Sequence, residues 1–218
     1  MTDRPAPLRI DIVSDVVCPW CIVGYRQLKQ ALDAKETPYD LHWHPFELNP
    51  SMPASGQNMS EHIMEKYGST AAESQANRDR LTELGSDLDF NFSFGPDTRM
   101  HNTFNTHQLI HWADTMGRGH DLKQALFSAH FTDNSDLSSP DVLADIAASI
   151  GLDVAEARAV LEDQRYAEAV RTEEKFWTQQ GITGVPAIIF DRKHLVTGAQ
   201  GADNYGNILD HLANAPAA

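Results

Sequence analysis

The sequence predicts an α/β fold in which a long helical segment separates two sheet-forming parts of the chain. Three observations lead to this prediction. A strand, a helix and a second strand are expected within residues 8–46. After a loop, the hydrophobic pattern is helical up to residue 180. Residues 186–213 then return to two short strands and a final helix.

The first three elements form a βαβ unit. Residues 8–13 are rich in β-branched side chains and predict a strand. Pro19 suits the first turn of a helix, and apolar residues recur at helical spacing over 20–34. Residues 39–46 alternate between apolar and polar side chains and predict a second strand. Such a unit normally makes a right-handed crossover between parallel strands.

The middle of the chain is predicted to be helical after a loop over 49–58. Asp153, with Glu156 three residues later, resembles a capping box at a helix start. Residues 90–94 are predicted as a loop or a short extended piece, because Gly-Pro follows them. Helices are expected over 59–67, 71–85, 102–116, 119–130, 140–150, 153–162 and 164–180.

The last part of the chain changes character. Residues 186–190 predict a buried strand, and a tight turn leads into a hairpin partner over 194–197. Glycines then break the pattern, and residues 202–213 predict a closing helix. The predicted order is therefore β-α-β, many helices, then β-β-α.

Length and composition fit one globular domain, or one domain that carries a large insertion. The chain has 218 residues, of which 41% are hydrophobic and 22% charged, which argues against disorder. The net charge is −14, and the isoelectric point is near 5.0. Nucleic acids and anionic membranes attract basic surfaces, so we expect neither as a partner. We interpret the acidity as a source of solubility; a preference for basic protein substrates is the alternative.

The N-terminal residues predict a cytoplasmic protein. Residues 1–7 contain no apolar run of signal length, and four charged or hydroxyl residues interrupt the apolar run over 8–17. We therefore expect neither a secretion signal nor a membrane span. The cytoplasm keeps thiols reduced.

The chain contains only two cysteines, Cys18 and Cys21, at the predicted start of a helix. A secreted disulfide scaffold would use more cysteines, and a structural zinc site needs more ligands than one pair supplies. A disulfide between them closes a very small loop and contributes little to global stability. The spacing therefore favours redox chemistry. Two half-ligands of a metal site, or an incidental pair of thiols, are the alternatives.

A cysteine pair at a helix start has the two properties that a dithiol enzyme needs. The unpaired N–H groups and the positive end of the helix dipole favour a thiolate at Cys18, and Cys21 lies one turn along on the same face. We predict that Cys18 attacks and Cys21 resolves the mixed disulfide. Pro19 stiffens the turn and Trp20 shields the sulfur, so both tune the pair. Because no His lies between the cysteines, we expect a less oxidising pair than one separated by Pro-His.

A second signal is Thr183-Gly184-Val185-Pro186 at the start of a predicted strand. Only ~5–6% of X–Pro bonds in folded proteins are cis, so the proline alone says little. In the expected fold this loop lies against the Cys18 sulfur. A cis bond there would turn the N–H and C=O of Val185 outward, ready to pair with an extended substrate. Gly184, Val185 and Pro186 are therefore the predicted substrate-binding residues. A proline that opens a strand edge is the alternative.

These motifs together resemble the DsbA-like branch of the thioredoxin superfamily, and within it the FrnE-type subfamily. The resemblance covers nearly the whole chain. The matching segments are residues 14–21, 45–50, 102–103, 181–186 and 196–200.

The resemblance implies a thioredoxin-like fold with a large all-helical insertion. The implied parts are residues 1–51, the insertion at 52–163, and residues 164–218. The implied activity is thiol–disulfide oxidoreductase or isomerase chemistry on protein or small-molecule disulfides, without a cofactor. The resemblance also leaves a homodimer through the insertion open.

The same branch resembles the kappa-class glutathione transferases and the 2-hydroxychromene-2-carboxylate isomerases. Those proteins typically carry Ser at the position of Cys18 and bind glutathione, so a glutathione-dependent transferase or isomerase is the alternative function. Glutathione stays open as a co-substrate, held at Val185 with a carboxylate at the helix start formed by Gly201, Ala202 and Asp203. A third interpretation is a non-catalytic redox sensor or chaperone-like module.

Several other side chains have two interpretations each. Asp15, three residues before Cys18, caps its loop or acts on the thiol proton. Glu47 is a loop residue or a proton relay near the sulfurs. Met59 and Met64 pack within helices or line a groove for apolar substrate segments.

Two histidine pairs have the spacing of metal ligands. His42 and His44 share a face of a strand, and His107 and His111 lie four apart on a helix. No nearby carboxylate or cysteine completes either pair in the sequence, so we expect no metal.

Overall fold

The computed structural model describes residues 7–214 of the chain. Residues 1–6, on which the expected absence of a secretion signal rests, lie outside this range. The elements are β1 (Leu8–Ser14), α1 (Pro19–Ala34), β2 (Tyr39–Pro45), β3 (Gln57–Asn58), α2 (Met59–Tyr67), α3 (Ala71–Asp87), β4 (Arg99–Met100), α4 (Phe104–Asp114), α5 (Gly119–Phe131), α6 (Pro140–Ser149), α7 (Val154–Asp163), α8 (Ala167–Gln179), β5 (Ala187–Phe190), β6 (His194–Thr197) and α9 (Ala202–Asn214).

A four-stranded mixed sheet forms the centre of the molecule, in the order β2-β1-β5-β6. β1 and β2 are parallel and joined through α1, which confirms the predicted βαβ unit. β5 runs antiparallel to β1, with Ile12 opposite Ile188, and β6 runs antiparallel to β5. The two ends of the chain therefore meet in adjacent strands.

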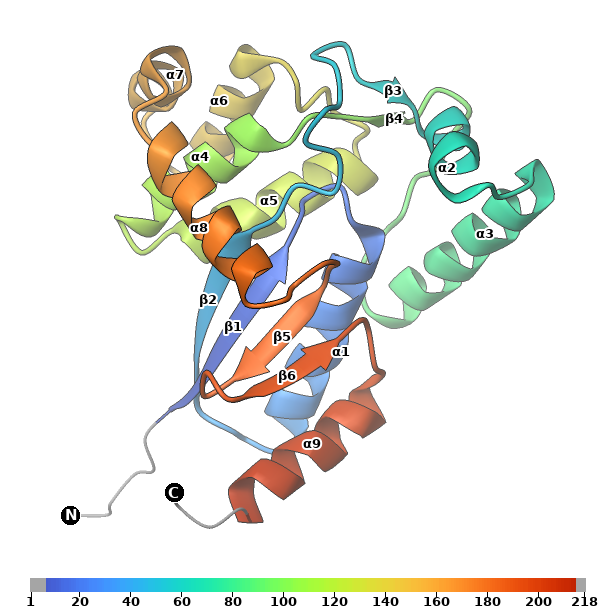
Figure 1. Cartoon of the computed structure of the whole chain (residues 1–218), viewed down its shortest axis with the longest axis vertical. Coiled ribbons are helices and arrows are strands. Elements are labelled where there is room, and N and C mark those ends of the chain that lie inside the picture. Colours follow the sequence, from blue (N-terminus) through green and yellow to red (C-terminus); the bar gives the residue numbers. More distant parts are fainter. Residues whose placement is uncertain (1–6, 215–218) are drawn as a thin grey trace.

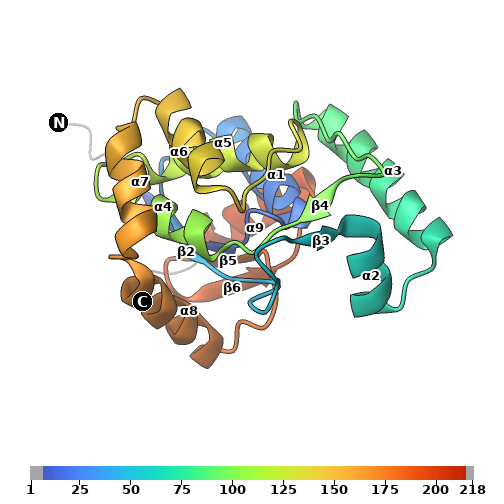
Figure 2. The same ribbon diagram turned by 90° about the horizontal axis from the view of Figure 1, so that it is seen from above.

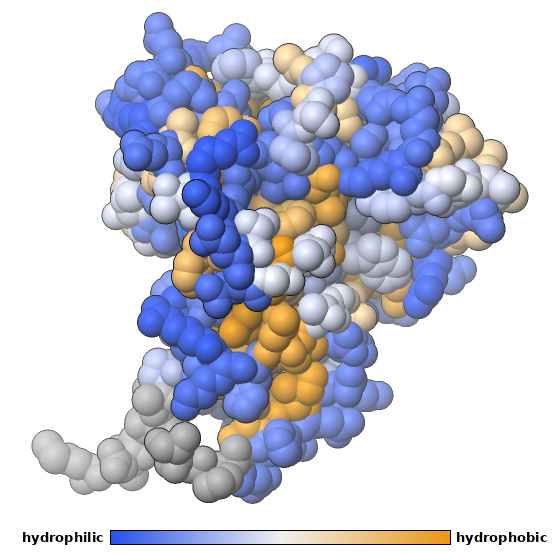
Figure 3. Space-filling view, in the orientation of Figure 1, coloured by the Kyte–Doolittle hydropathy of each residue, from blue (hydrophilic) through white to orange (hydrophobic). Residues whose placement is uncertain are grey.

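Helices cover the two faces of this sheet unequally (Figure 1). On one face, α1 and α9 pack against each other and against Ile10 and Phe190, because α1 buries Ile22, Leu28 and other residues at helical spacing. On the other face lies α8, which contacts β2 (Figures 1 and 2). Apolar side chains remain visible over β5 and β6 below α8 (Figure 3). Leu195 of β6 is half exposed.

The segment between β2 and α8 holds α2 to α7 and builds a second hydrophobic cluster. Leu109, Leu126, Leu143 and Val160 from four of these helices are fully buried in it. The α/β fold with a helical insertion is thereby confirmed. The boundaries at 52 and 163 remain predictions.

Two local predictions differ from the structure. The loop predicted over 49–58 ends in β3, which pairs antiparallel with β4; a two-residue ribbon has no readable period, so only tertiary contacts define it. The helix predicted over 164–180 begins at Ala167, because Gln164 adopts a left-handed conformation (φ 54°) and ends α7. Within residues 7–214, no helix combines the length and hydropathy needed to cross a bilayer.

Candidate active site

The two cysteines occupy the first turn of α1. Cys18 is the N-cap residue, in an extended conformation (φ −93°, ψ 108°), and its side chain caps no N–H group. Pro19 follows in the first turn, as predicted. The Cys21 N–H donates to Cys18 O over 3.0 Å, so the second thiol lies one turn behind the first.

The surroundings of the two thiols differ. Cys18 is 3% exposed and lines a groove, whereas Cys21 is fully enclosed. Burial raises the pKa of the Cys21 thiol well above its usual value, and a hydrogen bond and negative charge from Cys18 raise it further. Lys123 opposes this shift. The fold therefore presents one thiol to the groove and keeps the other protonated behind it.

The loop before β5 covers the first thiol. The Val185–Pro186 peptide bond is cis, and the Cys18 thiol lies 3.6 Å from the Val185 carbonyl oxygen. Pro186 is buried against α1, where a Cβ on Gly24 would approach its Cγ to 3.3 Å. Gly24 thus permits the close approach of loop and helix, a role that the sequence pattern did not indicate. The predicted residues Gly184, Val185 and Pro186 all line a shallow cavity of about 320 Å³ on this side.

The Asp15 side chain connects the loop before α1 with the loop after β2. Its side chain is fully buried and accepts the Leu48 N–H over 2.7 Å, which supports the capping interpretation. Burial raises its pKa, but the His107 hydrogen bond and charge, the Leu48 N–H and Lys123 outweigh burial, so the net pKa is lowered. No hydrogen bond joins the Asp15 carboxylate to either sulfur within the described residues.

Lys123 is a buried cation that the sequence interpretation missed. It is 1% exposed, and its Nζ donates to Ser14 O over 3.4 Å. Burial lowers its pKa to about 8, although the negative charges of Cys21, Asp15 and Cys18 act in the opposite direction. The available signal was its position in the buried stripe of α5, beside Leu122.

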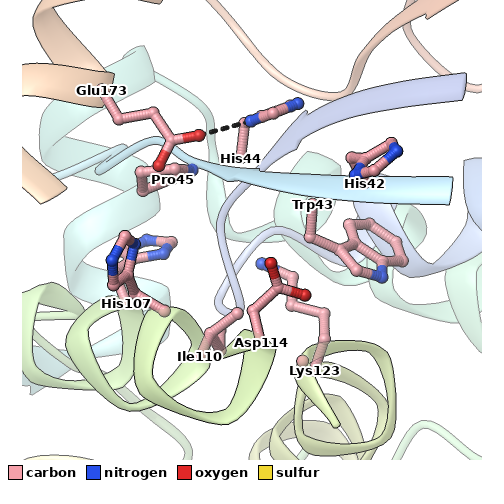
Figure 4. A pocket seen from close by; sticks show the side chains of 11 residues that line it. His42, Trp43, His44, Pro45, His107, Ile110, Asp114, Lys123 and Glu173 are labelled. Atoms are coloured by element: carbon pink, nitrogen blue, oxygen red, sulfur yellow. Dashed lines mark hydrogen bonds and ion pairs between the residues drawn. The ribbon is translucent and has the colours of Figure 1, made fainter. Parts of the chain in front are cut away.

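Both histidine pairs meet in one cavity at the edge of β2 (Figure 4). The cavity measures about 150 Å³, and Lys123 also lines it. His44 is engaged on both ring nitrogens, at 2.8 Å from Asp11 and 2.5 Å from Glu173. Within residues 7–214, no group of three or more His, Cys, Asp or Glu side chains is arranged to hold a metal ion.

Glu47 faces α8 and not the sulfurs. Its carboxylate forms an ion pair with Arg171, which also contacts Glu174 at 2.8 Å. Burial, followed by the charge of Glu174, raises the pKa of Glu47, and Arg171 opposes the shift. These contacts fix the loop after β2 to α8, in agreement with the loop interpretation.

A groove of about 390 Å³ opens beside Cys18, between α1, α2 and α3. Trp20 and Met59 line it, but Met64 does not and is 38% exposed. At the proposed glutathione position, the Gly201 N–H already donates to Gln27 Oε1 over 2.8 Å. That donor is therefore occupied by the protein itself.

Comparison with known proteins places this geometry in a family. The model described as DSBA-like thioredoxin domain matches residues 9–212. A probable DsbA oxidoreductase from Streptomyces coelicolor is similar in structure, with a TM-score of 0.91, 31% identity, and coverage of 97% of this chain and 92% of that chain.

Two further proteins are similar to this chain. The uncharacterized protein YwbO of Bacillus subtilis (strain 168) is 28% identical over 198 residues, which are 90% of this chain and 92% of that protein. The cytosolic disulfide reductase DsbM from Pseudomonas aeruginosa, solved with GSH, has a TM-score of 0.65 at 16% identity, covering 95% of this chain and 100% of that chain. The DsbM similarity concerns the fold alone.

Proposed function

The chain belongs to the DSBA-like thioredoxin domain family, and from this premise we propose that it is a thiol–disulfide oxidoreductase whose redox pair is Cys18 and Cys21. One observation carries the proposal. Cys18 lies at the N-terminus of α1, beside a groove and 3.6 Å from the carbonyl of Val185. Cys21 lies directly behind it.

The proposed reaction proceeds by two exchanges. The Cys18 thiolate attacks a substrate disulfide, forms a mixed disulfide and releases one substrate thiolate. Cys21 then loses its proton and attacks the Cys18 sulfur, which releases the second substrate thiolate and leaves an intramolecular disulfide. The two substrate sulfurs gain the two electrons that the dithiol loses. Run in reverse, the same steps oxidise a substrate dithiol.

The neighbouring residues have proposed supporting roles. Pro19 supplies no N–H and fixes the first turn, while the half-buried Trp20 shields the Cys18 sulfur from water. The Val185 carbonyl would release the thiol and pair with the backbone of an extended substrate. Gly184 and Pro186 shape the same surface.

Protein or small-molecule disulfides are the proposed substrates, and glutathione is the proposed thiol that returns the pair to its reduced state. We place the reaction in the cytoplasm, where both cysteines stay reduced between turnovers; this setting favours reduction or isomerisation. The glutathione-dependent transferase alternative has less support, because both cysteines are present and the Gly201 N–H is occupied.

The reduction potential of the pair tests this proposal. We expect a two-electron transition in glutathione buffers between about −120 and −270 mV, towards the reducing end of this range. Thiol alkylation followed by mass measurement counts the free thiols in each buffer. Cys21→Ser should accumulate a mixed disulfide with substrate, and the matched variant Cys18→Ser should not. A pair that never forms a disulfide would exclude the dithiol mechanism.

A further inference from the structure

Three basic side chains line the groove beside Cys18 or contact residues that line it, in a protein whose net charge is −14. Arg78 lines the groove, and the Arg80 guanidinium lies 5.4 Å from the centre of the Trp20 ring, which lines it too. Lys66 Nζ donates to the groove residue Asn49 over 2.6 Å. Among residues 7–214, no carboxylate lies within 4.0 Å of these three cations. These three side chains therefore bring positive charge to the groove that no directly contacting carboxylate balances.

One carboxylate also lines the groove, and it is already occupied. Glu73 accepts the N–H and the hydroxyl of Thr70, each over 2.8 Å, in the capping box of α3. The Glu73 carboxylate thus caps the N-terminus of α3. Within residues 7–214, Arg78 has no acidic partner.

Neutral groups hold Arg78 in place between α2 and α3. Its Nη1 donates to Ser60 Oγ and to Ser74 Oγ, each over 3.0 Å, and its Nη2 donates to Gln75 Oε1 over 2.7 Å. Hydroxyl and amide acceptors leave the positive charge of the guanidinium uncompensated. Its Nε–H has no acceptor within residues 7–214 and remains able to bind a carboxylate.

The rest of the groove is largely apolar. Its volume of about 390 Å³ lies within the range of ~300–1,000 Å³ that is typical of small-molecule sites. The apolar side chains that line it include Met59, Ile63, Leu81, Phe94 and Met100. A compact apolar group would fit between α2 and α3 while its sulfur reaches Cys18.

We infer that this groove is a subsite for low-molecular-weight organic disulfides that bear a carboxylate, with Arg78 as the residue that binds the anion. The inference rests on the proposed function and names its substrate class. Cys18 displaces one carboxylate-bearing thiolate and forms the mixed disulfide. Cys21 displaces the second thiolate, so the substrate gains two electrons and the protein becomes the disulfide.

Two aromatic disulfides that differ in charge test the inference: 5,5′-dithiobis(2-nitrobenzoate), which carries carboxylates, and 4,4′-dithiodipyridine, which does not. Stopped-flow absorbance gives the rate at which each oxidises the reduced protein. In Arg78→Gln, the ratio of the anionic to the neutral rate should fall about tenfold, as expected for one lost charge-assisted contact. Added salt should lower the same ratio in the wild type.

The matched control is Arg99→Gln. Arg99 donates to the backbone carbonyls of Ser55 and Gly56 and does not line the groove, so the ratio should stay at the wild-type value. An unchanged ratio in Arg78→Gln, or a salt-insensitive ratio in the wild type, would overturn the subsite while leaving the dithiol mechanism intact. If neither disulfide oxidises the wild-type pair, the proposed function fails instead.

Discussion

Single residues in this protein take their chemistry from the element that encloses them, and Lys123 is the clearest case. Its ammonium group lies 5.5 Å from the centre of the Trp43 ring and 5.2 Å from that of Phe127, with one backbone carbonyl as its hydrogen-bond partner. Burial makes the charged form costly, and the negative groups around the thiols compensate only in part. The charge of Lys123 therefore destabilises the folded state at neutral pH.

Lys123→Met should reveal this cost through its pH dependence. The folded pKa is about 8 and the ordinary value is 10.5, so between these values the unfolded chain binds the extra proton and stability rises with pH. Relative to the variant, the wild type should gain ~2–3 kcal/mol of unfolding free energy between about pH 7 and pH 10.5. Urea unfolding at several pH values measures the difference.

Lys175→Met, on the exposed side of α8, is the control and should show no such gain. Parallel stability curves for the wild type and Lys123→Met would contradict the interpretation.

Sequence reasoning could place Cys18, Cys21 and Pro186, because each belongs to a short local motif. It could not place Lys123 or Arg78, since the packing of the insertion brings Lys123 near the thiols and Arg78 to the groove.

At the scale of elements, local signals predicted most helices and strands. Ser139 caps α6 through the Val142 N–H at 3.4 Å, and Asp153 caps α7 through the Glu156 N–H at 2.8 Å. Such contacts lie within one turn, so the sequence displays them. The β3–β4 ribbon joins residues more than forty positions apart, and two residues on each strand carry no periodic pattern.

α3 docks on the core through Gly85, and this contact yields a prediction. A Cβ at Gly85 would lie 2.5 Å from the Phe90 carbonyl oxygen and 2.6 Å from the Phe92 ring. Gly85→Ala should therefore lower the free energy of unfolding by about 1–3 kcal/mol, despite the higher helix propensity of Ala. Chemical denaturation measures the change.

Gly206→Ala in α9 is the matched control. Its new Cβ would meet only the flexible end of Lys35, at 3.3 Å, so helix propensity should dominate and stability should stay equal or rise by up to ~1 kcal/mol. Equal effects of the two substitutions would show that the contacts of Gly85 do not decide its cost.

At the scale of the whole molecule, α5 joins the two hydrophobic clusters. Phe127 and Phe131 of α5 belong to the cluster that includes Ile10 and Phe190 of the sheet. Leu122 and Leu126 belong to the cluster of the insertion. The same sequence pattern predicts a buried helix in either case, so the sharing of α5 became visible only in the structure. Because one rigid helix serves both clusters, we expect sheet and insertion to unfold together.

Phe131→Ala tests this cooperativity. Phe131 is 1% exposed, and its ring packs at 5.2 Å from the Phe92 ring centre. Its removal should cost ~3–5 kcal/mol, while tryptophan fluorescence and circular dichroism still report one coincident transition. Phe176→Ala, at a half-exposed position on α8, should change stability by less than ~0.5 kcal/mol. Two separate transitions would refute a shared core.

Because β5 pairs with β1, the central sheet is completed only after most of the chain has been synthesised. Val185, whose carbonyl contacts the Cys18 thiol in the folded protein, follows Cys18 by 167 residues. At ~5–20 residues per second, the ribosome therefore adds Val185 on the order of 10 to 30 s after Cys18. Throughout that interval the nascent chain holds both cysteines without β5, β6 or α9. The two thiols are therefore accessible to oxidants in the nascent chain, whereas the folded protein encloses them.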